Sequence, residues 1–143
     1  MDSRGGPAPA PPGPGAPALI LVDSDVLIAH LRGRAEATDW LLRARRDQGR
    51  LQASAVSVAV VGGGIRSGER RVVSRLLSSL QVWPVDEPVA WAAAELTRTY
   101  RRSHSGIGLG DYLIAATALV GGFELATLNV RHFPMFAGLR SPF

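Results

Sequence analysis

The chain has 143 residues, of which 46% are hydrophobic, and this suits a single domain with its own core. It contains no cysteine, which excludes disulfides and thiolate metal sites and fits a cytoplasmic location, and no apolar run is long enough to cross a membrane. All 16 basic residues are arginine and the net charge is +4, which indicates either an anionic partner such as nucleic acid or an ordinary basic surface.

The first 18 residues differ in composition from the rest of the chain. Residues 1–18 are mostly proline, glycine and alanine, which bury too little apolar surface to become ordered, so we predict a disordered tail. Residues 19–143 are predicted to form one domain. It opens with an apolar run at 19–22, typical of a strand buried on both faces, followed by apolar residues at helical spacing. Ser24 or Asp25 is the expected cap of that helix.

Strands and helices alternate along the remainder of the domain. Further strands are predicted at 51–55, 81–85 and 125–128, and further helices at 35–46, 56–65, 67–80, 86–100 and 111–120. Ser67 and Asp86 are the expected caps of two of these helices. The alternation predicts an α/β fold, a three-layer α/β/α sandwich with a mainly parallel central sheet. In such sheets, ligands bind at the carboxyl ends of the strands.

Three polar residues stand where such a site is expected. Asp23 and Asn129 directly follow predicted strands, and Asp111 opens a predicted helix. Each has an ordinary structural explanation when taken alone, because Asp and Asn are common in caps and turns.

Three segments carry a resemblance to a known family. They read LVDSDVLI at 21–28, GDYLIAATA at 110–118 and LATLNVRHF at 125–133. In wording, order and spacing they resemble PIN-domain ribonucleases, and in particular the VapC toxins of bacterial toxin–antitoxin pairs. The resemblance covers residues 19–143 and implies a PIN-like fold.

The resemblance also implies an activity and partners. It implies hydrolysis of RNA phosphodiester bonds with Mg²⁺ or Mn²⁺, in which Asp23 and Asp111 are catalytic metal ligands and Asn129 is a third catalytic position. A VapB-like antitoxin and a second copy of the chain are the implied protein partners. Several arginines could contact RNA phosphates, namely Arg66, Arg70, Arg71, Arg101, Arg102 and Arg131.

One residue departs from the pattern of this family. A glutamate is expected in the helix after the second strand, but the chain reads VAVVG at 58–62 and Val60 stands at the glutamate position. We expect a buried valine there, which binds neither metal nor proton, and we interpret Glu69 as a first-turn helix residue. His132 is most simply a surface histidine. Two functions remain open: a weakened ribonuclease toxin, or a catalytically inactive PIN module that binds an antitoxin.

Overall fold

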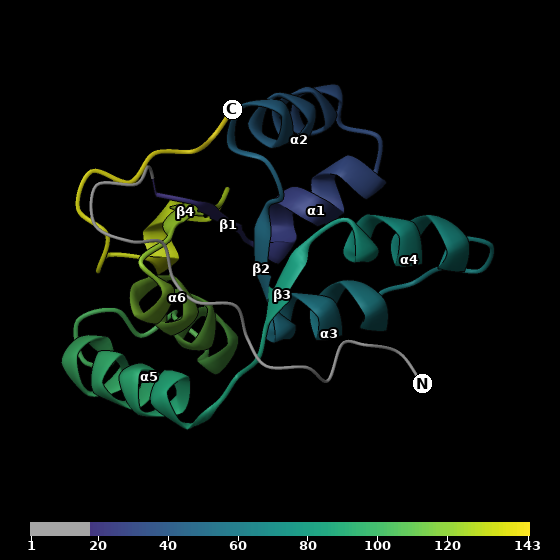
Figure 1. The fold of residues 1–143 in the computed structure, drawn as a ribbon. Coiled ribbons are helices and arrows are strands. Elements are labelled where there is room, and N and C mark those ends of the chain that lie inside the picture. The colour runs from purple at the N-terminus through teal and green to yellow at the C-terminus, as the bar shows by residue number, and fades with distance from the viewer. Residues whose placement is uncertain (1–17) are drawn as a thin grey trace.

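The computed structural model describes residues 18–143, so all but the last residue of the predicted tail lies outside the described residues. Four short strands form one sheet at the centre of the domain (Figure 1). They are β1 (Ile20–Val22), β2 (Gln52–Ser54), β3 (Gln81–Trp83) and β4 (Glu124–Ala126). The order across the sheet is β3-β2-β1-β4 and every pairing is parallel, which confirms the predicted sheet.

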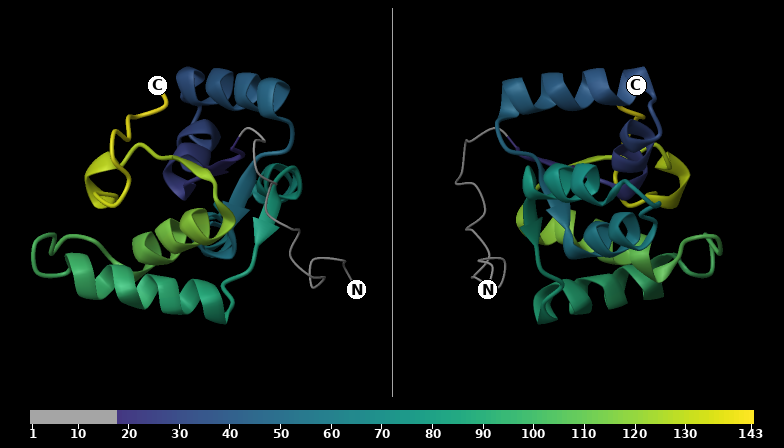
Figure 2. Two further views of the ribbon diagram at one scale, coloured as in Figure 1. Left: turned by 60° about the vertical axis from the view of Figure 1, so that its left-hand side comes forward. Right: turned by 90° about the vertical axis from the view of Figure 1, so that its right-hand side faces the viewer.

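Helices connect the strands and cover both faces of the sheet. Within the described residues they are α1 (Ser24–Leu31), α2 (Ala35–Gln48), α3 (Ala55–Gly63), α4 (Arg70–Ser78), α5 (Glu87–Tyr100), α6 (Leu109–Gly121) and the short 3₁₀-helix η2 (Val130–His132). The core places α1, α2 and α4 on one face, and α6 on the other with α5 outside it (Figure 2). This is the predicted three-layer sandwich. None of these helices is both long and apolar enough to cross a membrane.

Two neighbouring residues of β1 explain why both faces need helices. Val22 packs with Val26 and Leu41 in one hydrophobic cluster, whereas Leu21 packs with Ile114 of α6 in another. Both β1 residues are completely buried. Because alternate side chains of a strand point to opposite faces, an uninterrupted apolar run requires a covering layer on each face.

The predicted caps of two helices are not the observed ones. The cap of α1 is Asp23 rather than Ser24 or Asp25, since its side chain accepts a hydrogen bond from the backbone N–H of Ser24. Helix α4 begins three residues after Ser67, because Gly68 has a φ of +84° and such a conformation cannot lie inside a helix. The predicted cap of α5 is confirmed, with Oδ1 of Asp86 accepting from a backbone N–H in the first turn.

The order of the strands creates a natural ligand site beside β1. The chain moves outward from β1 to β2 and β3, and then returns to place β4 on the opposite side of β1. From β1 it continues into α1 on one face, whereas the segment after β4 packs through Phe133 against the other face. Neighbouring strands whose connections diverge in this way leave a crevice at their carboxyl ends. Asp23 and Thr127 lie at this point.

The end of α6 is closely packed against an aromatic ring. A side chain at Gly121 would place its Cβ 2.2 Å from Cε2 of the buried Phe123, which also packs edge-on against Trp83. We expect Gly121→Ala to lower the free energy of unfolding by roughly 1–3 kcal/mol, as measured by urea denaturation. Gly62→Ala in α3 is the control, because nothing lies within 4 Å of a Cβ there. It should raise the free energy of unfolding by up to about 1 kcal/mol, and equal effects of the two substitutions would contradict the packing argument.

Candidate active site

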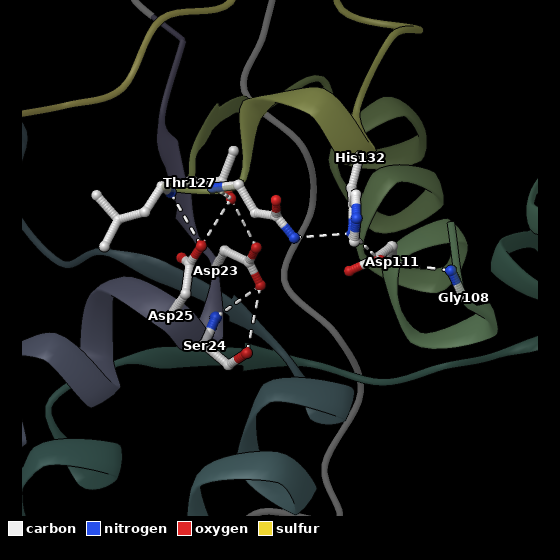
Figure 3. Close-up of polar contacts among 9 residues, drawn as sticks. Asp23, Ser24, Asp25, Gly108, Asp111, Thr127 and His132 are labelled. Carbon is white, nitrogen blue, oxygen red and sulfur yellow. Dashed lines mark hydrogen bonds and ion pairs between the residues drawn. The ribbon is translucent and has the colours of Figure 1, made fainter. Parts of the chain in front are cut away.

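Asp23 is fixed at the junction of β1 and α1. Its backbone N–H donates to the carbonyl of Ala126 in β4 at 2.9 Å. Its Oδ1 accepts from the backbone N–H of Ser24 at 2.7 Å, and its Oδ2 accepts from the hydroxyl of Thr127 at 2.8 Å (Figure 3). Only 4% of the residue is exposed. The carboxylate is therefore held from both of its oxygens in a buried position.

Thr127 connects Asp23 with a second carboxylate. Its hydroxyl lies 2.8 Å from Oδ2 of Asp23 and 3.2 Å from Oδ2 of Asp25. A hydroxyl has one proton, so it donates to one of the two at a time, while its oxygen accepts from the backbone N–H of Asn129 at 3.0 Å. Asp25 also accepts from the backbone N–H of Leu128 at 3.0 Å, and its Oδ1 is buried without a hydrogen-bond partner. Asp25 thus ties α1 to the turn after β4.

Asp111 reaches the same region from the first turn of α6. The helix begins two residues earlier than predicted, and Oδ2 of Asp111 accepts from the backbone N–H of Gly108 at 3.4 Å. The same oxygen lies 2.9 Å from Nδ1 of His132 (Figure 3). Nδ1 of His132 is in turn 2.7 Å from Nδ2 of Asn129. The fold therefore places the three predicted residues, Asp23, Asp111 and Asn129, in one connected region.

Two residues of this region were not predicted to take part. Thr127 was assigned to a strand, but β4 ends at Ala126 and the threonine belongs to the following turn. His132 is predicted as a surface or turn histidine that could assist; its side chain is about one-third exposed, and it contacts Asp111. The signal that could have drawn attention to both is their position in the LATLNVRHF segment, on either side of Asn129.

Burial and neighbouring charge act strongly on Asp23. Burial, and after it the negative charges of Asp25 and Asp111, raise the pKa of Asp23 to about 6, while the hydrogen bonds from Thr127 and Ser24 act in the opposite direction. Burial also raises the pKa of Asp25. Because the charge of Asp111 acts on Asp23, the two carboxylates lie within electrostatic reach of each other. A cation between them would relieve this repulsion.

The donor set fits a hard divalent cation. Mg²⁺ commonly takes one or two carboxylates from the protein and completes its shell with waters and substrate phosphates. Asp23 and Asp111 could provide that pair, and no arginine of the described residues forms an ion pair with either of them. Within residues 18–143, no three acidic or histidine side chains gather closely enough to hold a metal by themselves. The arrangement is therefore an open two-carboxylate site rather than a closed cage.

Val60 is not buried, contrary to the expectation from the sequence. It is 47% exposed, because α3 turns the neighbouring Val61 into the core instead. Val60 lines a small cavity together with Arg32 and Glu69. Both oxygens of Glu69 are engaged, one by Arg32 at 3.2 Å and the other by the backbone N–H of Arg66 at 2.8 Å. Glu69 is therefore committed to its own helix start and does not replace the missing glutamate.

The raised pKa of Asp23 predicts a characteristic pH dependence of stability in the absence of divalent cations. Below 3.8 the carboxyl is protonated in the folded and the unfolded chain, whereas between 3.8 and about 6 only the folded chain keeps the proton. Folding then takes up a proton, so the free energy of unfolding falls as the pH rises through this window, by about 3 kcal/mol in total. Asp23→Asn should lack this loss when both proteins are denatured with urea in EDTA at about pH 4 and about pH 7. The same pH dependence in both proteins would contradict the assignment.

The comparisons with known proteins agree with the fold. The PIN-domain family model matches residues 20–138. The chain is 61% identical over 125 residues to Ribonuclease VapC10 of Mycobacterium tuberculosis, covering 87% of this chain and 93% of that protein. It is 39% identical to Ribonuclease VapC19 of the same species, over 87% of this chain and 100% of the relative. The chain therefore belongs to the PIN-domain family and, within it, to the VapC proteins.

Solved structures show the same architecture. A toxin–antitoxin complex from Klebsiella pneumoniae matches with a TM-score of 0.71 at 24% identity, covering 87% of this chain and 98% of that chain. A DNA-bound VapBC complex from Salmonella typhimurium also has a TM-score of 0.71, at 21% identity, covering 87% of this chain and 97% of that chain. At these identities the likeness establishes the fold, which is the predicted PIN-like sandwich.

Proposed function

We propose that the protein is the toxin of a toxin–antitoxin pair and hydrolyses RNA phosphodiester bonds with Mg²⁺ or Mn²⁺, at a rate weakened by Val60. The observation that carries this proposal is that the fold brings Asp111, in the first turn of α6, into the same hydrogen-bonded region as Asp23 at the carboxyl end of β1. The names of the relatives, which are ribonucleases, support RNA as the substrate.

The residues of the site would have different roles in this reaction. Asp23 and Asp111 would hold the cation, which when bound neutralises phosphate charge and makes a bound water more acidic. Burial and the hydrogen bonds from Ser24 and Thr127 keep Asp23 in one position. Asn129 is exposed and anchored through its backbone N–H, and the amide atom that does not face His132 is available to orient water or a phosphate oxygen.

An arginine-rich surface of α4 favours the proposal of a polyanionic substrate such as RNA. Arg70, Arg71 and Arg75 line an open concave surface with Ser74, and none of the three forms an ion pair within the described residues. Unpaired arginines attract phosphates, and the guanidinium group matches two phosphate oxygens at once.

We also propose a VapB-like antitoxin and a second copy of the chain as protein partners, acting in the cytoplasm. Titles of structural neighbours that describe toxin–antitoxin complexes support the antitoxin. Apolar surface is available for such contacts. An open cavity of about 250 Å³ lies between α2 and α4 and is lined largely by leucines, and Trp91 of α5 is 63% exposed. Size-exclusion chromatography with light scattering would measure the copy number.

The test is cleavage of a labelled structured RNA by the full chain, in Mg²⁺, in Mn²⁺ and in EDTA. We expect slow, metal-dependent cleavage that is absent in EDTA. An Asp111→Asn protein purified in the same way shows whether a contaminating nuclease is responsible. Cleavage that survives EDTA, or that is equal in the two proteins, would overturn the proposal.

The apolar Val60, which stands where the family resemblance predicts a glutamate, supports a second candidate function. If the wild type cuts no RNA in either metal while Val60→Glu does, the chain is a PIN module without catalysis that binds an antitoxin. Co-expression with a candidate VapB-like antitoxin, followed by co-purification, would then test the antitoxin role directly.

A further inference from the structure

His132 contacts the side chains of two of the three predicted site residues. Its Nδ1 lies 2.9 Å from Oδ2 of Asp111 and 2.7 Å from the amide nitrogen of Asn129. Asp111 belongs to α6, whereas Asn129 and His132 belong to the turn after β4, so the imidazole connects two elements that meet only through folding. The ring is about one-third exposed and Asp111 about one-quarter exposed, so the contact lies at the mouth of the site.

The position of the imidazole is set by its neighbours in the chain. The backbone N–H of His132 donates to the carbonyl of Asn129 at 3.0 Å within η2. The next residue, Phe133, is 1% exposed and packs in the core under α6. The other ring nitrogen, Nε2, faces Gly106 in the loop before α6. Because the adjacent Phe133 fixes the backbone of His132, the ring points Nδ1, and not Nε2, toward Asp111.

Nδ1 of His132 cannot both donate a hydrogen bond to Asp111 and accept one from the amide nitrogen of Asn129. A carboxylate has no proton, so a hydrogen bond to Asp111 requires the proton on Nδ1 of His132. The amide of Asn129 must then face Nδ1 with its oxygen, because an N–H group cannot donate to a nitrogen that carries a proton. The charge on Asp111 favours this arrangement, since hydrogen bonds to an ionised acceptor are the stronger ones.

We propose that His132 is a positioning residue for the divalent cation: its Nδ1–H holds Oδ2 of Asp111, so that the remaining oxygen of Asp111 is kept for a cation shared with Asp23. Oδ2 of Asp111 accepts from both His132 and Gly108, whereas no hydrogen bond within the described residues reaches Oδ1. Partners that orient a metal ligand in this way commonly change metal affinity or activity by roughly 10- to 100-fold. The inference rests on the proposed metal-dependent function and concerns the binding step.

The experiment measures the affinity of the full chain for Mn²⁺ by isothermal titration calorimetry, in the wild type and three variants. His132→Asn keeps a polar N–H close to the place of Nδ1, His132→Gln moves it to the place of Nε2, and His132→Ala removes it. We expect His132→Ala and His132→Gln to bind Mn²⁺ at least about 10-fold more weakly, and His132→Asn to stay within about threefold of the wild type. Thermal unfolding of all four proteins serves as the control for folding.

The outcomes separate this inference from the proposed ribonuclease activity. Unchanged affinity in His132→Ala and His132→Gln would overturn it, as would an equal loss in His132→Asn. If His132→Ala fails to fold, the comparison of the Asn and Gln variants decides, because both retain a polar side chain. A wild type that binds no Mn²⁺ at millimolar concentration overturns the inference. A wild type that binds Mn²⁺ through His132 but cuts no RNA leaves it standing and overturns the ribonuclease instead.

Discussion

We expect Asp111→Asn to lower metal-dependent RNA cleavage at least about 100-fold, because a bound cation contributes several kcal/mol to the transition state and each ~1.4 kcal/mol is tenfold in rate. Asparagine has the size of aspartate and can still accept the hydrogen bond from the backbone N–H of Gly108. The substitution therefore removes the charge that holds the cation and little else. Steady-state cleavage at a series of Mn²⁺ concentrations would show whether the loss comes from cation affinity or persists at saturation.

The matched control is Asp39→Asn in α2. Asp39 is exposed and forms no ion pair or side-chain hydrogen bond within the described residues, so its substitution changes the net charge of the protein by the same amount away from the site. It should leave cleavage unchanged. A similar loss in both variants would mean that general electrostatics, rather than a cation held by Asp111, governs the rate.

The substitution Val60→Glu should have the opposite effect and raise metal-dependent cleavage by roughly 10- to 100-fold. The family resemblance predicts a glutamate at this position, and a third carboxylate would add negative charge to a site that has only two. The exposed position of Val60 leaves room for a longer side chain, and glutamate favours a helix more than valine does. Cleavage and Mn²⁺ affinity of the variant are both measurable on the same preparation.

Val60→Gln separates the charge from the shape of the introduced side chain. It has the length of glutamate and can donate or accept hydrogen bonds, but it brings no negative charge to a cation. We expect its cleavage rate to stay within about threefold of the wild type. A gain with Val60→Gln equal to that with Val60→Glu, or no gain with either, would show that position 60 does not face the cation.

Much of the fold follows from local patterns in the sequence. The apolar run at 19–22 predicts a strand with a helical layer on each face, and the clusters around Leu21 and Val22 confirm it. The Asp86 cap was also correct, because a cap needs only residues close together in sequence. The boundaries were less accurate. The strands contain three residues each, since the sheet pairs over a shorter stretch than the apolar runs suggest.

The sequence by itself determined the chemistry that is available: carboxylates at 23 and 111, an amide at 129, and a valine where the family resemblance predicts a glutamate. Only the tertiary structure decided how these groups cooperate. The hydroxyl of Thr127 reaches Asp23 across 104 positions of the chain, and His132 reaches Asp111 across 21. Such contacts depend on the order of the strands and on the packing of α6 against the sheet. They are set by burial of distant apolar surfaces rather than by any local pattern, and for that reason no reading of neighbouring residues reveals them.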